Sequence, residues 1–109
     1  MEFSCTKNQN FLNYINKCDF KNIIVCGIES HICIMQTSIE LLQKGYNILI
    51  PRDAIGSRSF LDNDTAFLRL ILSGAIASTT ESLICELCKT SNRKEFREVS
   101  KILKNSFSN

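Results

Sequence analysis

Three short apolar runs alternate with segments of helical periodicity along this chain of 109 residues. The runs occupy residues 23–26, 48–50 and 75–77. Short β-branched runs separated by helices are typical of a parallel sheet, whose strands are joined by right-handed helical crossovers. Gly45 and Gly74 precede the second and third runs, where a helix commonly ends on a left-handed residue. The pattern predicts an α/β fold in the order helix–strand–helix–strand–helix–strand–helix–helix.

The composition narrows the class of protein. Hydrophobic residues make up 44% of the chain, charged residues 22%, and the net charge is +2. This apolar content is too high for a disordered chain, and no window contains the roughly 18–20 apolar residues of a membrane span. The near-neutral charge gives no reason to expect nucleic acid or a membrane as partner. We expect residues 1–109 to form one soluble domain or part of one.

The chain contains six cysteines, which are free thiols in a reducing compartment or can form disulfides in an oxidising one. Residues 1–5 lack the basic and apolar regions of a signal peptide. We therefore expect free thiols and a cytoplasmic location, with a mitochondrial one if an N-terminal extension exists. Cys85 and Cys88 have the spacing of a redox or zinc pair, but a lone pair on an apolar helix face favours packing. Neither a metal nor another cofactor is expected.

Chemistry is expected where the first run ends at Gly27, because reactive groups of open α/β sheets gather at the carboxyl ends of strands. Ser30 is expected to cap the next helix, which places Cys33 in its first turn. Backbone N–H groups there stabilise a thiolate and could hold a developing oxyanion. From spacing alone a buried structural cysteine is the favoured alternative, because five other cysteines are present.

Charged and polar residues near the expected strand ends have two interpretations each. His31 is the only histidine and is interpreted as a loop residue lining the pocket, since it lies too close in sequence to Cys33 to act as its base. Asp53 is expected to cap or brace the loop together with Arg58. Arg52 and Arg58 could bind a substrate carboxylate or be solvated loop charges, and the second interpretation is favoured.

Four motifs occur in collinear order: Val-Cys-Gly-Ile-Glu-Ser-His-Ile-Cys-Ile (25–34), Asp-Ala-Ile-Gly-Ser-Arg-Ser (53–59), Ser-Thr-Thr-Glu-Ser-Leu (78–83) and Phe-Arg-Glu-Val-Ser-Lys-Ile-Leu-Lys (96–104). They resemble the isochorismatase-like cysteine hydrolase family, especially its isochorismatase domain-containing proteins, over residues 23–104. The resemblance implies a three-layer α/β/α Rossmann-like fold with a parallel sheet ordered 3-2-1-4-5-6. Only the C-terminal three strands of that sheet and their flanking helices would lie in this chain.

The same resemblance implies a set of site residues. Cys33 stands at the position of the catalytic nucleophile, and the peptide bond Ile28–Glu29 at the position of a cis bond. The backbone N–H groups of Glu29 and Cys33 would form the oxyanion hole, and His31 and Arg58 would contact a small-molecule substrate. The implied reaction is attack of the Cys33 thiolate on an amide or related C–N bond, followed by thioester hydrolysis.

The family's catalytic Asp and Lys have no counterparts in this chain, because the Lys position falls just ahead of Met1 and the Asp follows a strand that is absent. We therefore expect the chain to be inactive alone, and we expect an unpaired strand edge at residues 23–26 that favours homo-oligomers. An alternative start, a truncated gene or an incomplete gene model would each give this pattern. A non-catalytic remnant, a binding or oligomerisation module, and a thiol-redox protein are the competing functions.

Overall fold

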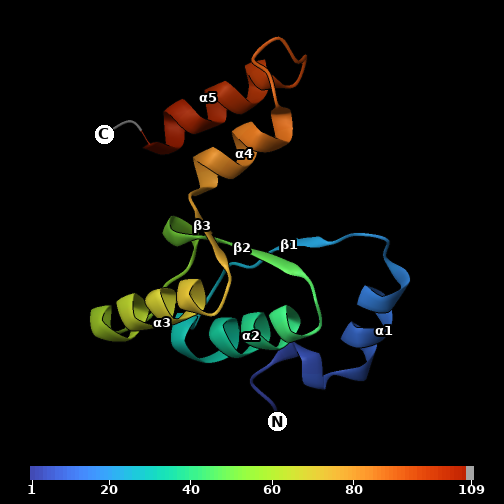
Figure 1. The fold of residues 1–109 in the computed structure, drawn as a ribbon. Helices are drawn as coiled ribbons and strands as arrows, with labels where there is room; N and C mark the ends of the chain where they lie inside the picture. Colours follow the sequence, from blue (N-terminus) through green and yellow to red (C-terminus); the bar gives the residue numbers. More distant parts are fainter. Residues whose placement is uncertain (108–109) are drawn as a thin grey trace.

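The computed structural model describes residues 1–107 and confirms the α/β fold with a parallel sheet (Figure 1). The sheet has three strands in the order β1-β2-β3, namely β1 (Asn22–Ile24), β2 (Asn47–Pro51) and β3 (Ile76–Ser78). All pairs are parallel, with Ile24 opposite Leu49 and Leu49 opposite Ile76. The three strands lie within two residues of the apolar runs in the sequence.

The described chain has five α-helices: α1 (Gln9–Lys17), α2 (Met35–Gln43), α3 (Phe60–Leu72), α4 (Thr80–Cys88) and α5 (Phe96–Phe107). Three short helical turns are η1 (Cys5–Lys7), η2 (Ser30–Ile34) and η3 (Arg52–Ala54). Figure 1 shows α2 and α3 side by side on one side of the sheet, while the hairpin of α4 and α5 stands on the other side, beyond β3. Among the described residues no helix is long and apolar enough to cross a bilayer.

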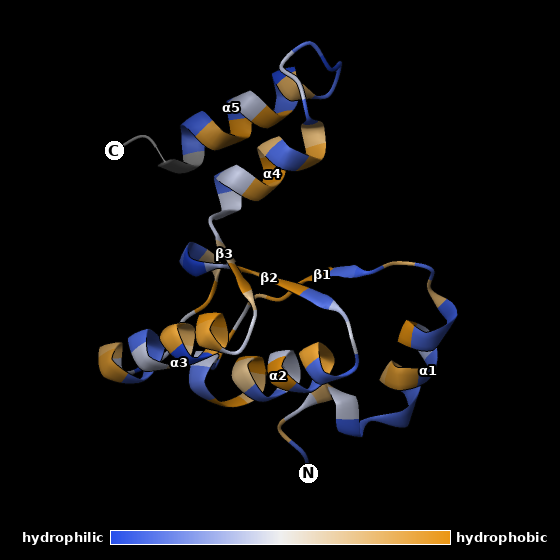
Figure 2. Cartoon of the chain, in the orientation of Figure 1, coloured by the Kyte–Doolittle hydropathy of each residue, from blue (hydrophilic) through white to orange (hydrophobic). Residues whose placement is uncertain are grey.

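The hydrophobic core lies between the sheet and helices α2 and α3. Ile48 and Ile50 alternate along β2 and are both 0% exposed, and they belong to one cluster with Leu41 of α2 and Leu70 of α3. Figure 2 shows apolar residues in all three strands and in the helices below them. The turn η2, which contains Cys33, packs on α2 and α3, so burial of this face also positions Cys33.

The opposite face of the sheet is only partly covered. Ile24, Leu49 and Ile76 form a row in register across the three strands, and Ile24 and Ile76 are 43% and 50% exposed. On its outer side β1 has no partner strand among residues 1–107. Strands of a parallel sheet are usually buried on both faces, as the apolar run at residues 23–26 predicts, but β1 is not. The expected free edge is present.

Turn η1 is anchored on α2 by side-chain hydrogen bonds. The Ser4 hydroxyl donates to a Glu40 carboxylate oxygen at 2.9 Å, and the Thr6 hydroxyl donates to the same oxygen. The Cys5 N–H donates to the Thr37 hydroxyl oxygen at 2.9 Å. Both Ser4 and Thr6 are buried, so these bonds satisfy polar groups that would otherwise be costly to desolvate. The network holds Cys5 beside α2.

The start of α4 differs from two sequence-based expectations. The spacing of Ser78 and Glu81 predicts a capping box, but the cap is Thr79, whose hydroxyl accepts from the Ser82 N–H at 3.3 Å. Asp53 does not pair with Arg58. Its carboxylate accepts from the Thr80 N–H at 2.8 Å and from the Thr80 hydroxyl at 3.0 Å. A carboxylate at a helix N-terminus is favoured by the free N–H groups and the helix dipole. This explains why Asp53 binds the start of α4 and not Arg58.

Candidate active site

The turn after β1 is pinned to the segment that follows β2. The Gly27 N–H donates to the Ala54 carbonyl at 2.9 Å, and the Gly56 N–H donates back to the Gly27 carbonyl at 3.2 Å. The Ser30 N–H then donates to the Gly56 carbonyl at 2.8 Å. Gly27 has a φ of 117°, a backbone conformation that residues with a side chain rarely adopt. The carboxyl ends of the two strands are thus joined, and the chain is directed into η2.

Cys33 lies in η2, a π-type turn that leads into α2. This differs from the expected position in the first turn of an α-helix. Ser30 is not the cap either, because it is fully buried and its hydroxyl has no hydrogen-bond partner among the described residues. The Ile28–Glu29 peptide bond is cis, as the resemblance implies. The Glu29 N–H donates no hydrogen bond within the described part of the chain.

A pocket of about 350 Å³ opens beside Cys33 along the outer edge of β1. The Cys33 side chain is half-buried, and its neighbours in the lining include Ile24, Cys26 and Ile28 from β1 and the turn. Thr37 of α2 and Cys5 of η1 also line it. The lining is mainly apolar, so the pocket can exclude water from part of a small molecule while leaving the thiol accessible. Sequence reasoning missed Cys5 and Thr37, because no motif links η1 to α2.

His31 and Glu29 belong to a polar cluster that does not line this pocket. The His31 Nδ1 lies 3.1 Å from the Ser57 hydroxyl and 3.6 Å from a Glu29 carboxylate oxygen, and its Nε2 lies 3.7 Å from Asp62. Arg58 is exposed, with its Nε 3.9 Å from the Glu29 carboxylate. The cluster ties η2 to the loop before α3. Ser57 and Asp62 carried no signal in the sequence that would have identified them as partners of His31.

Arg52 lies outside the pocket and is engaged elsewhere. It pairs with Asp64 at 2.7 Å, and its guanidinium carbon lies 4.7 Å from the centre of the Phe67 ring. Both charged side chains of the pair are more than half exposed, as the interpretation of a solvated loop charge predicts.

Only one cysteine of the Cys85–Cys88 pair fits the packing interpretation. Cys88 is buried, whereas Cys85 is exposed on α4. Within residues 1–107 no group of three or more His, Cys, Asp or Glu side chains is placed to hold a metal ion.

Comparison with known sequences gives a family match over most of the chain. The sequence model of the isochorismatase domain matches residues 1–82. The secreted isochorismatase effector Isc1 of Phytophthora sojae is 37% identical over 77% of this chain and 40% of its own length. Isochorismatase domain-containing protein 2 of Xenopus laevis is 40% identical over 78% of this chain and 42% of its own length. The chain therefore spans less than half the length of these relatives.

Solved structures also match most of this chain and about half of their own length. The structure of MAR1 ribonuclease from Caenorhabditis elegans superimposes with a TM-score of 0.83 and 36% identity, covering 92% of this chain and 50% of that one. The Escherichia coli YcaC protein, titled an octameric hydrolase of unknown specificity, superimposes with a TM-score of 0.79 over 96% of this chain and 58% of its own. At 18% identity, the second comparison shows the shared fold alone.

Proposed function

Because the chain belongs to the isochorismatase family and carries its hydrolase-like domain in part, we propose that it supplies the nucleophile of a cysteine hydrolase acting on an amide or related C–N bond. One observation supports this most strongly. Cys33 lies in the turn at the carboxyl end of β1, half-buried at a pocket of about 350 Å³, and the Glu29 N–H, which donates no hydrogen bond among the described residues, belongs to the same turn. A nucleophile and an oxyanion donor in one turn are the minimum for acyl transfer.

The proposed reaction has two steps. The Cys33 thiolate attacks the carbonyl carbon, a C–S bond forms, and the negative charge on the carbonyl oxygen is stabilised by the Glu29 and Cys33 N–H groups. The C–N bond then breaks, and the amine leaves with a proton from a general acid. Water attacks the thioester, the C–S bond breaks, and the thiolate and a carboxylic acid are released.

The acid–base groups for these steps are not proposed from this chain. Glu29 and His31 pair with each other and with Ser57 in the polar cluster, outside the lining of the pocket. No Asp or Lys is among the described residues that line the Cys33 pocket. We therefore propose that the chain is inactive by itself and that a complementary half of the domain, in a longer product or another chain, adds along β1 and supplies both groups.

The proposal includes a compartment and an assembly state. The five cysteines besides Cys33 are also free thiols, which is compatible with a reducing, cytoplasmic environment. The apolar row of Ile24, Leu49 and Ile76 and the free edge of β1 favour self-association of the isolated chain. We propose a small-molecule amide as the substrate, because the lining beside Cys33 is mainly apolar, as is typical of sites for small molecules.

Complementation tests this function. The purified chain is assayed for hydrolysis of nicotinamide and simple aliphatic amides, alone and after co-expression with the N-terminal half of the Xenopus relative. We expect no turnover alone and measurable turnover in the complemented protein. Turnover should be lost in Cys33→Ala and retained in Cys26→Ser, a matched change in the same pocket.

Three results would contradict parts of this proposal. Turnover by the chain alone that disappears in Cys33→Ala contradicts the claim of inactivity. Retained turnover in the complemented Cys33→Ala protein contradicts the role of Cys33. A folded complemented protein whose Cys33 reacts with iodoacetamide no faster than Cys26, and which hydrolyses none of the amides, favours the non-catalytic alternative.

A further inference from the structure

Basic residues of this chain are concentrated in the loop that follows α4 and in helix α5. Residues 89–104 contain six of the thirteen Lys and Arg residues but only two of the eleven acidic residues. The rest of the chain is therefore slightly acidic, and the net charge of +2 conceals a strongly basic C-terminal segment. The expectation that nucleic acid is not a partner rested on that net charge, which carries no information about distribution.

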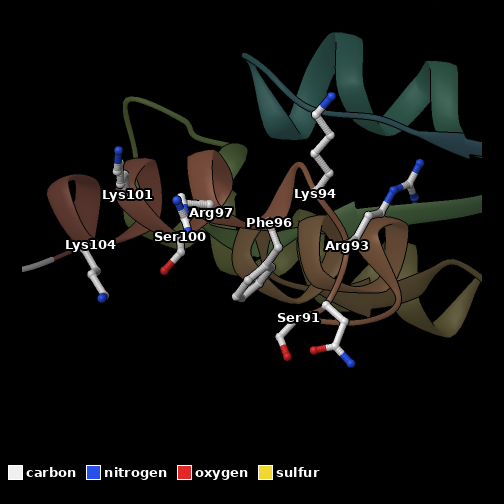
Figure 3. A pocket seen from close by; sticks show the side chains of 9 residues that line it. Ser91, Arg93, Lys94, Phe96, Arg97, Ser100, Lys101 and Lys104 are labelled. Atoms are coloured by element: carbon white, nitrogen blue, oxygen red, sulfur yellow. The ribbon is translucent and has the colours of Figure 1, made fainter.

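Five of these six basic residues line a second, larger hollow. It has a volume of about 760 Å³ and is formed by residues 91–94 of the loop and by the exposed side of α5. Figure 3 shows the Phe96 ring flanked by Ser91 of the loop and Ser100 of α5, with cationic side chains at both ends of the hollow. Phe96 is half-buried, so part of its ring remains accessible. The lining cations are Arg93, Lys94, Arg97, Lys101 and Lys104.

Most of this positive charge is not neutralised within the chain. Arg93 bonds Glu95 at 3.1 Å and the Leu87 carbonyl at 3.1 Å, which holds the loop against α4. Lys101 lies 4.0 Å from Glu98, a weak exposed pair. The other three lining cations form no ion pair among the described residues; they are Lys94, Arg97 and Lys104.

We propose that this basic hollow binds single-stranded polynucleotide. Proteins that bind single strands without sequence preference combine a cationic groove for the phosphates with an aromatic ring on which a base stacks. Arg97, Lys101 and Lys104 follow one side of α5 at helical spacing, and Phe96 supplies the ring. The proposal concerns the α4–α5 hairpin and does not depend on Cys33 chemistry.

Two other anionic partners fit less well. A membrane-bound helix presents a whole apolar side to the lipid, whereas on α5 Leu103 is buried, Val99 is half-buried and Ile102 is exposed next to Lys101. A small phosphorylated ligand would contact few of the cations at once, because they are exposed and spread from the loop to the last turns of α5 around an open hollow. An extended polyanion matches exposed cations in a row, because it gains from many weak, salt-dependent contacts.

The test measures binding of the full chain to a fluorescent oligouridylate of about 12 nucleotides, within the site sizes of known single-strand binders. Anisotropy is recorded over a series of salt concentrations. We expect the triple variant Arg97→Ala/Lys101→Ala/Lys104→Ala to lose most affinity and to flatten the slope of log affinity against log salt by about 2. Phe96→Leu, which keeps an apolar side chain, should weaken binding about fivefold or more.

The matched control removes three exposed lysines elsewhere, in Lys17→Ala/Lys21→Ala/Lys44→Ala, with the same change in net charge. Circular dichroism checks that every variant retains its helices. Retained affinity in the control supports a local site, whereas equal loss in both triple variants overturns the proposal. Absence of oligonucleotide binding, including the case in which the chain binds phosphatidylserine vesicles instead, also overturns it.

Discussion

Gly27 is the residue on which the geometry of the candidate site depends most directly. Its φ of 117° turns the chain from β1 toward η2, and a Cβ there would lie 3.6 Å from the Ile34 Cδ1, an ordinary contact. The energetic cost of a side chain at position 27 would therefore come from backbone strain and not from a steric clash. We expect Gly27→Ala to lower the free energy of unfolding by about 1–3 kcal/mol, measured by urea denaturation.

Gly56 provides the control for this substitution. It lies in the same joined pair of turns, its φ is not in the positive region, and an added Cβ would lie 3.8 Å from Ile28. Gly56→Ala should change the free energy of unfolding by less than about 0.5 kcal/mol. Equal effects of the two substitutions would show that the conformation of Gly27 does not constrain the turn.

At the scale of elements, hydrophobic patterning predicted the strands and helices because burial dominates where they lie. Ile48 and Ile50 point into the core at the period of a strand, and the strand predicted at residues 48–50 lies within β2 (Asn47–Pro51). The local polar contacts were harder to predict. Thr79 rather than Ser78 caps α4, because the choice among adjacent hydroxyl residues depends on backbone angles that composition does not encode.

In the candidate site, too, some features could be predicted from the sequence and others could not. Cys33 and the turn around it could be predicted from the sequence because a contiguous motif contains them. The partners of His31 were not, since Ser57 and Asp62 reach it only through the packing of α3 against η2. The π-type form of η2 also has no signature in composition, as it arises from how the turn is held between two strand ends.

Helix α3 gives a test of how much the core contributes. Leu70 is 0% exposed against β2 and α2, whereas Leu72, two residues later on the same helix, is 79% exposed. Leu70→Ala should lower the free energy of unfolding by about 2–5 kcal/mol, because it leaves a cavity in the core. Leu72→Ala should change it by less than about 0.5 kcal/mol. Similar losses in thermal or urea melts of both variants would contradict the packing described for α3.

The whole molecule exposes more surface than a compact protein of its mass. Its accessible surface is 7729 Å², about a quarter above the roughly 6,100 Å² expected. The radius of gyration is 15.3 Å against about 13 Å expected, because the α4–α5 hairpin stands away from the sheet (Figure 1). The surplus is about twice the roughly 800 Å² that each partner buries in a standard interface. Part of this exposed surface lies at the free edge of β1, where Ile24 is 43% exposed and lines the Cys33 pocket.

This surface leads to a prediction about assembly. An unpaired strand next to exposed apolar side chains pairs with a second copy unless a charge opposes it. We expect the purified chain to sediment as a concentration-dependent oligomer and Ile24→Lys to shift it toward the monomer. Leu68→Lys, an equal change on the exposed side of α3, should leave the mass distribution unchanged. An oligomer that persists in Ile24→Lys but dissociates in Leu68→Lys would place the interface on α3. Because β1 also borders the Cys33 pocket, the complementary half of the domain should compete with the second copy and dissociate the oligomer as it binds.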